Sequence, residues 1–290
     1  MRMEKRSMAL FTVLVHLALS GCALQPGLYG LDAELTEQEK SEPEAKYYTP
    51  VFAPLPPEVE EALAEGPVDP GRALRLADIK DLIKPGYLAV ENGYCVNPDR
   101  TGFVAVKTDM PGVTADMIQW WFWWHAEKDI RYKIWCPGDH YAISVKNRDQ
   151  ADDTALSYEQ RRVNNTHYPY EDTGTGVFQL SIRFVPPETL FGCDPTKDSA
   201  TNGIEAVVCA VVGYKVGMVT VEHTYMTHVF RRTPGGLELR SRFWPGSALK
   251  SEGLRKMTID RDVVKGLAYH CAREFSHLAG FLPEIYQEMR

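Results

Sequence analysis

His270 and Glu274 are the two residues whose spacing most directly suggests chemistry in this sequence. The segment HCARE (270–274) falls in a helical pattern, and side chains four residues apart on a helix project from one face about one turn apart. An imidazole and a carboxylate in that arrangement can share a metal ion. Many pairs with this spacing are simply solvated, so a metal site requires further ligands from other segments.

Two other segments could supply such ligands. His125 directly follows five consecutive aromatic residues (120–124), which predicts a buried imidazole that is either a hydrogen-bonded core residue or a ligand. The polar loop 164–172 contains His167, Glu171 and Asp172, although acids in loops are usually solvated. From the residues alone, both interpretations stay open for each segment.

The remaining histidines give weaker indications. His223 and His228 fall five residues apart on one predicted strand, so at most one of them should face a cavity. His140 follows Pro137-Gly138 and is predicted to lie in a surface turn. The sequence contains no G-x-S-x-G, P-loop, dinucleotide-binding or H-E-x-x-H motif, which argues against serine hydrolases and nucleotide-dependent enzymes.

The elements that must position these side chains are strands followed by one long helix. The helices are predicted at 58–65 and 73–83, after Thr114 as N-cap, and from Asp260 onward. Strands are predicted at 94–96, 103–107, 142–146, 177–185, 206–214, 217–232 and 236–244. Short connections between strands favour an antiparallel sheet. The predicted fold class is α+β: a curved antiparallel sheet around the C-terminal helix, with a cavity between them.

The first 22 residues are typical of an export signal. Arg2, Lys5 and Arg6 precede the apolar stretch 8–19, which is too short to span a bilayer. The ending LSGC (19–22) resembles a bacterial lipoprotein signal, in which Cys22 is acylated; the alternative is an ordinary signal peptide. We therefore expect an exported cell-envelope lipoprotein, periplasmic or anchored in the outer membrane, that touches the membrane only through this lipid.

Composition limits the partners. The chain has 290 residues, 44% of them hydrophobic, and a net charge of −7. Eleven acidic residues and two lysines between 31 and 69 carry the excess, so residues 70–290 are neutral and nucleic-acid binding is not expected. The predicted divisions are a signal peptide (1–22), an acidic Pro-containing tether (23–57), an N-terminal helical region (58–92) and a catalytic domain (93–290). The five cysteines after Cys22 are odd in number and allow one or two disulfides.

Several long blocks resemble the 2,4-diacetylphloroglucinol hydrolase family, which includes phloretin hydrolase. They are KDLIKPGY (80–87), ENGYCV (91–96), TDMPGVT (108–114), WWFWWH (120–125), RYKIW (131–135), RSRFWPG (240–246) and LAGFLPEIY (278–286). The resemblance runs from about residue 54 to the C-terminus. It implies a zinc-dependent C–C hydrolase with a helix-grip (START or birch-pollen-allergen-like) domain, and an N-terminal region through which a homodimer can form.

The resemblance also implies a ligand set for Zn²⁺ of His125, Glu171, His270 and Glu274. Because residues 146–162 read as an insertion, Glu159 is the alternative to Glu171. The implied reaction is hydrolysis of an acyl–aryl bond in a phenolic ketone. Such a reaction needs a proton donor near the ring, for which His228 and His167 are the candidates. The aromatic run could stack the phenolic ring, with most of its tryptophans in the core.

Two alternatives remain at this level. A helix-grip cavity can simply carry an apolar ligand, which would make the chain a non-catalytic binding lipoprotein. The same metal could also serve hydrolysis of another ester or diketone. Four ligands from three distant segments argue against the simple carrier.

Overall fold

The computed structural model describes residues 31–290, so the predicted signal peptide and Cys22 lie outside the described residues. The described strands form one antiparallel sheet in the order β1-β2-β9-β8-β7-β6-β5-β3, with β4 paired to β6. They are β1 (Gly93–Val96), β2 (Gly102–Pro111), β3 (His140–Ala142), β4 (Thr166–His167), β5 (Tyr170–Asp172), β6 (Val177–Val185), β7 (Ile204–Val216), β8 (Val219–Thr233) and β9 (Gly236–Pro245).

Most strands lie close to where the sequence predicts them. The predicted strand 177–185 is β6, the predictions 206–214 and 236–244 fall within β7 and β9, and the prediction 217–232 begins two residues before β8 and ends one residue short of it. The prediction at 142–146 is wrong: β3 begins at His140, and Val145 makes only an isolated bridge to His167. The expected strand was thus placed two residues too late.

The helices are short apart from the last one. They are α2 (Pro57–Ala64), α3 (Ala115–Trp124), α4 (Asp129–Lys133), α5 (Arg148–Asp152), α6 (Tyr158–Arg162), α7 (Glu188–Phe191), α8 (Pro195–Asp198), α9 (Glu252–Thr258) and α10 (Arg261–Met289). The 3₁₀ turns are η1 (Glu39–Ser41), η2 (Pro43–Tyr47), η3 (Pro70–Arg72), η4 (Leu76–Ile83), η5 (His125–Glu127) and η6 (Ala200–Asn202). None of the helices in residues 31–290 is long and apolar enough to cross a membrane.

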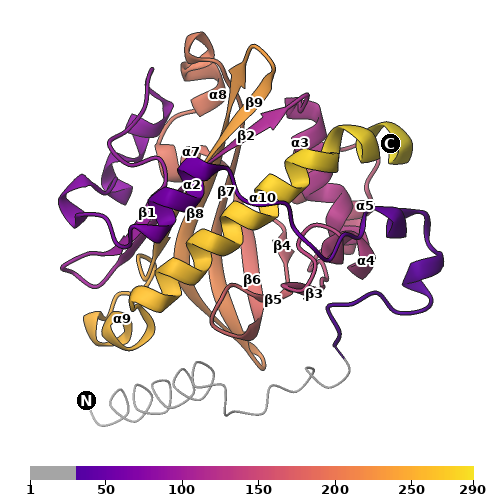
Figure 1. The fold of residues 1–290 in the computed structure, drawn as a ribbon, viewed down its shortest axis with the longest axis horizontal. Helices are drawn as coiled ribbons and strands as arrows, with labels where there is room; N and C mark the ends of the chain where they lie inside the picture. The colour runs from indigo at the N-terminus through magenta and orange to yellow at the C-terminus, as the bar shows by residue number, and fades with distance from the viewer. Residues whose placement is uncertain (1–30) are drawn as a thin grey trace.

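α10 crosses one face of the sheet, which we call the inner face (Figure 1). Asp260 caps the helix by accepting from the N–H groups of Asp262 and Val263. The apolar stripe of α10 packs against inner-face residues such as Val104 and Val106 of β2. The predicted α+β class, with a curved antiparallel sheet and a C-terminal helix, is confirmed.

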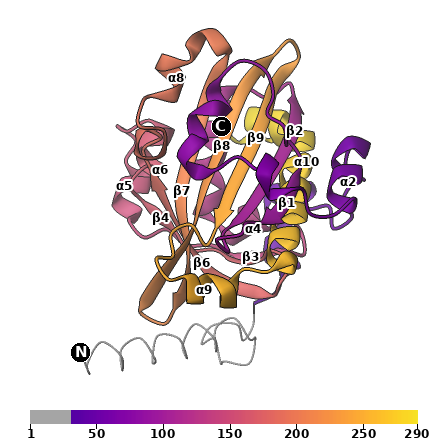
Figure 2. The same cartoon turned by 90° about the vertical axis from the view of Figure 1, so that its left-hand side faces the viewer.

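The opposite, outer face is covered by residues 68–92 (Figure 2). Ile79 and Leu82 of η4 pack there against Phe103 and Ala105, the β2 residues that alternate with the inner-face valines. The sheet is therefore buried on both sides. This explains why β9 is buried along nearly its whole length, including its two arginines.

The acidic segment before residue 57 is not a free tether where the structure describes it. Glu44 is 2% exposed and pairs with Arg131 at 2.8 Å, and Glu39 pairs with Lys133 at 2.9 Å. Tyr47 packs on Phe281 of α10. Composition shows the acidic charges of this segment but not the basic residues of α4 that pair with them.

Candidate active site

A cavity lies between the inner face of the sheet and α10. Its wall is largely apolar, with lining residues that include Leu180, Ile182, Val212, Met226, Phe243 and Leu267. Polar side chains enter this wall from β5, β8 and α10. An apolar cavity with a few convergent polar groups is the usual form of a small-molecule site.

His140 and Glu171 are direct cross-strand partners in the β3–β5 pair. Side chains opposite each other in an antiparallel pair share one face of the sheet. His140 is fully buried, and its Nε2 atom lies 3.8 Å from Oε2 of Glu171. Tyr132 donates a short hydrogen bond from its hydroxyl to the same carboxylate oxygen.

α10 brings His270 and Glu274 to this pair. Their spacing places Nε2 of His270 3.8 Å from Oε2 of Glu274, which also lies 3.8 Å from Nε2 of His140. The close approach depends on Gly174 and Gly266. A Cβ on Gly174 would lie 2.6 Å from the Cα of Gly266, so only glycine lets the β5–β6 turn rest directly on the helix.

Both imidazoles direct Nε2 toward the carboxylates, because Nδ1 is hydrogen-bonded on the opposite side. Nδ1 of His140 lies 3.0 Å from the carbonyl oxygen of Tyr132, which can only accept, so Nδ1 carries the proton. Nε2 then presents a lone pair, and within residues 31–290 it has no hydrogen-bond partner. His270 is oriented in the same way, with Nδ1 3.2 Å from Oδ2 of Asp139. A carboxylate or carbonyl behind each ligating imidazole is usual in metal sites.

Two carboxylates, Glu171 and Glu274, are buried close together beside the imidazoles, and burial disfavours their charged forms. Burial raises the pKa of Glu171, and burial together with neighbouring carboxylates raises the pKa of Glu274 to about 8. Although burial disfavours a charged ring, Asp139, Glu274 and Glu171 raise the pKa of His270 to about 9. The lone pair of His140 thus faces two carboxylates in a buried place, an arrangement that a bound cation would stabilise.

The donor set fits a divalent metal that accepts nitrogen and oxygen ligands. Two zinc ligands at ~2.0–2.2 Å from the ion can be at most ~4.4 Å apart, and the three 3.8 Å separations meet that limit. Cys136 is a further neighbour: it forms with His140 and His270 a buried group whose ligand atoms lie within 4.8 Å of one another. Its thiol is 3.6 Å from Asp139, and burial raises its pKa well above the usual value.

Comparison with known proteins identifies the family of this chain. The family model described as "DAPG hydrolase PhiG domain" matches residues 74–287. The chain belongs to this family. The 2,4-diacetylphloroglucinol hydrolase of Pseudomonas sp is 29% identical over 267 residues, covering 86% of this chain and 89% of the relative. The phloretin hydrolase of Eubacterium ramulus is 33% identical over 267 residues, covering 89% of this chain and 94% of the relative. The family resemblance predicted from the sequence is thereby confirmed.

In this family member the structure brings together three of the four predicted ligands: Glu171, His270 and Glu274. The remaining imidazole in the group is His140, and the prediction that His140 lies in a surface turn is wrong. His125 also lines the cavity, but none of the described carboxylates lies within 4 Å of its ring nitrogens. The alternative ligand Glu159 lies on α6, beside a separate surface depression.

The two predicted proton donors both line the cavity. Nδ1 of His228 is fixed at 2.8 Å from the hydroxyl of Ser241, and burial lowers its pKa to about 3, which keeps the ring neutral. His167 packs against the edge of Phe184 and has no side-chain hydrogen bond to any described residue. His228 is therefore the better oriented of the two.

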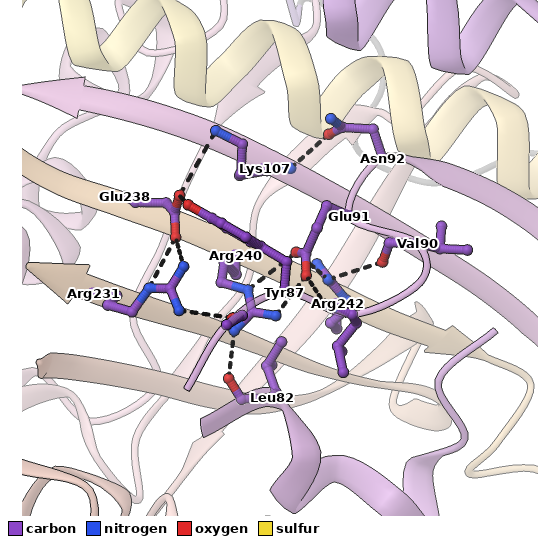
Figure 3. Close-up of polar contacts among 12 residues, drawn as sticks. Leu82, Tyr87, Val90, Glu91, Asn92, Lys107, Arg231, Glu238, Arg240 and Arg242 are labelled. Atoms are coloured by element: carbon purple, nitrogen blue, oxygen red, sulfur yellow. Dashed lines mark hydrogen bonds and ion pairs between the residues drawn. The ribbon is translucent and has the colours of Figure 1, made fainter. Parts of the chain in front are cut away.

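β9, which pairs with β8 at His228, is anchored by contacts on the outer face of the sheet. Ser241 points inward from β9, while its neighbours Arg240 and Arg242 point outward to Glu91 (Figure 3). Both arginine–carboxylate contacts measure 2.6 Å, and both arginines are fully buried. The alternation of R-S-R along one strand thus links an ion network on one face to a cavity residue on the other.

The prediction that at most one of His223 and His228 faces the cavity is wrong, because both line it. Opposite them on β7, Val212 pairs with Thr224 and Gly213 with Glu222, which leaves His223 as an extra residue in β8. Such a bulge shifts the alternation of side chains by one position. The prediction assumed that side chains alternate between the two faces along the whole strand, which holds only for a strand without a bulge.

The aromatic run contributes less to the cavity than expected. Trp120, Trp121 and Trp124 are core residues, and Trp123 stacks on Tyr158 of α6. Within the run only Phe122 lines the cavity. The expectation that most of the tryptophans are core is confirmed, and the ring that could contact a ligand is a phenylalanine.

Proposed function

We propose that this protein is a zinc-dependent hydrolase that cleaves the bond between an acyl carbon and a ring carbon of a phloroglucinol-type phenolic ketone. The observation that carries the proposal is the lone pair of His140, which faces two buried carboxylates beside an apolar cavity. Membership in a family with named hydrolases supports it. We also infer that the sheet and α10 form a helix-grip domain of the START or birch-pollen-allergen type.

The ion would be held by His140, Glu171, His270 and Glu274. When bound, zinc would polarise the acyl carbonyl and make a water molecule more acidic. Asp139 orients the ring of His270 through Nδ1, and the ring would give up its Nε2 proton on binding the metal.

The protein's own groups serve the proton transfer. The reaction adds the hydroxyl of water to the acyl carbon and a proton to the ring carbon, which leaves as a phenol. His228 is neutral, and Ser241 fixes its Nδ1, so Nε2 remains to pass a proton between a phenolic oxygen and the ring carbon. The apolar wall, including Phe122 and Phe243, excludes bulk water from the ring.

The test is hydrolysis of an acylphloroglucinol by the zinc-loaded protein in ¹⁸O-labelled water. We expect a phenol and a carboxylic acid that carries one labelled oxygen. Replacement of Glu274 with glutamine removes one ligand at nearly constant volume and should reduce turnover by at least about 100-fold. Stoichiometric binding of the ketone without cleavage by the wild type would instead support the ligand-carrier alternative, which four convergent ionisable groups do not favour.

We further propose that the protein is an envelope lipoprotein anchored through Cys22, on the strength of the leader in residues 1–22. Replacing Cys22 with serine should release the protein from the membrane fraction and leave its turnover unchanged. Fractionation of cells expressing each form tests this. Membrane association that persists in the serine variant would contradict the anchor.

A further inference from the structure

A second polar group interrupts the cavity wall on β8. Thr224 and His223 of β8 line the cavity, and Thr258 lies behind them. Thr224, Met226 and His228 all line the cavity from the same strand. At ~3.3 Å per residue, Thr224 lies ~13 Å along the strand from His228, with Met226 between them.

The bulge in β8 creates this group. Neighbouring residues on a regular strand face opposite ways, whereas His223 and Thr224 are hydrogen-bonded through Nδ1 and Oγ1 at 2.8 Å. The bulge requires Gly213 on β7, because a Cβ there would lie 2.6 Å from the carbonyl oxygen of Val221. The sequence therefore places two polar side chains where an unbroken strand would present one.

The hydrogen bonds behind Thr224 have a single consistent direction. The hydroxyl of Thr258 lies 2.9 Å from the carbonyl oxygen of Leu254, which can only accept, so the proton of Thr258 is used there. Thr258 must then accept from Nε2–H of His223 at 3.2 Å. Burial lowers the pKa of His223 to about 4, so the neutral ring has a lone pair on Nδ1.

The hydroxyl of Thr224 therefore donates its hydrogen to Nδ1 of His223. The Thr224 oxygen keeps its acceptor capacity, and within the described residues no other side chain or backbone group donates to it. A ligand that reaches this part of the cavity is therefore matched when it offers an O–H or N–H donor. A ligand that placed a hydrogen-bond acceptor there would find no donor, because the hydroxyl hydrogen of Thr224 is already donated to His223.

We propose that Thr224 is a specificity residue that accepts a hydrogen bond from a hydroxyl at the far end of the substrate's acyl chain. The preferred substrate then has two polar ends, the acylated phenolic ring near the metal ligands and a hydroxyl beside Thr224, separated by an apolar linker that passes Met226. This inference rests on the proposed function for its substrate class. The hydrogen-bond direction at Thr224 is independent of that function.

The test compares two acylphloroglucinols. In one the acyl chain ends in a para-hydroxyphenyl ring, and in the other it ends in an unsubstituted phenyl ring. Wild type should prefer the hydroxylated compound in kcat/KM by about tenfold, the value of one hydrogen bond of ordinary strength. Thr224→Val keeps the shape of the side chain and should abolish the preference through KM, with kcat little changed. Thr224→Ser keeps the hydroxyl and should retain it.

Binding measured by calorimetry separates this inference from the proposed function. Both compounds are titrated into the inactive Glu274→Gln protein with and without Thr224→Val. Loss of the binding preference in the valine variant supports the Thr224 subsite even if wild type hydrolyses neither compound, a result that would overturn the proposed function alone. Equal binding and equal kcat/KM of the two compounds in wild type, with hydrolysis intact, would overturn the subsite alone.

Discussion

Replacing His140 with glutamine should abolish stoichiometric zinc binding and lower the hydrolysis rate by about 10³-fold. The substitution removes the Nε2 lone pair that faces Glu171 and Glu274, and a metal that supplies several kcal/mol of transition-state stabilisation is lost with it. Metal content by mass spectrometry, measured beside turnover, checks both parts. Thermal unfolding of the same sample shows whether the variant is folded.

His125→Gln is the matched control. Both histidines are buried, and both donate from Nδ1 to a backbone carbonyl, His125 to that of Trp121 at 2.7 Å. They differ in what faces Nε2: His140 has two carboxylates within 4 Å, whereas the structure gives His125 none among residues 31–290. We therefore expect His125→Gln to keep its zinc. The opposite result, with zinc lost from the His125 variant and kept in the His140 variant, would restore the ligand set implied by the family resemblance.

The elements that hold the site follow from local patterns, and for this reason much of the fold could be predicted. The alternation in 177–185 identifies β6, and Asp260 followed by an apolar stripe identifies α10. His270 and Glu274 share a helix face because they are four residues apart, and this does not depend on which element packs against the helix. These features depend on neighbours within about one turn or a few strand residues.

The features that the sequence could not reveal depend on distant partners. His140 stands in a three-residue strand after a Pro-Gly turn, and only its pairing with β5 places it against Glu171. His223 enters the cavity because β7 carries Gly213 opposite the bulge. The one available hint for His140 was the tight turn itself, since a turn at 137–139 returns the chain toward the preceding helix.

The second large effect is expected from Glu91→Gln on the outer face of the sheet. The carboxylate bridges Arg240 and Arg242, whose guanidinium groups are fully buried beneath residues 84–92 (Figure 3). Removing its charge leaves two buried cations without a counter-ion, which typically costs about 3–5 kcal/mol of the free energy of unfolding. Urea unfolding at pH 7 measures the loss. Glu252→Gln, which breaks a solvent-exposed pair with Lys256, should leave the stability essentially unchanged.

The difference between wild type and Glu91→Gln should shrink as the pH falls. Although burial alone would raise it, Arg240 and Arg242 lower the pKa of Glu91 to about 2, below the ~4.3 of an unfolded chain. A carboxylate with a depressed pKa contributes its stability fully above the unfolded value and loses it as the pH falls toward 2. The gap measured at pH 7 should thus persist to about pH 5 and narrow below about pH 4. A gap that stays constant over this range would mean that Glu91 stabilises the fold through its shape and hydrogen bonds rather than through its charge.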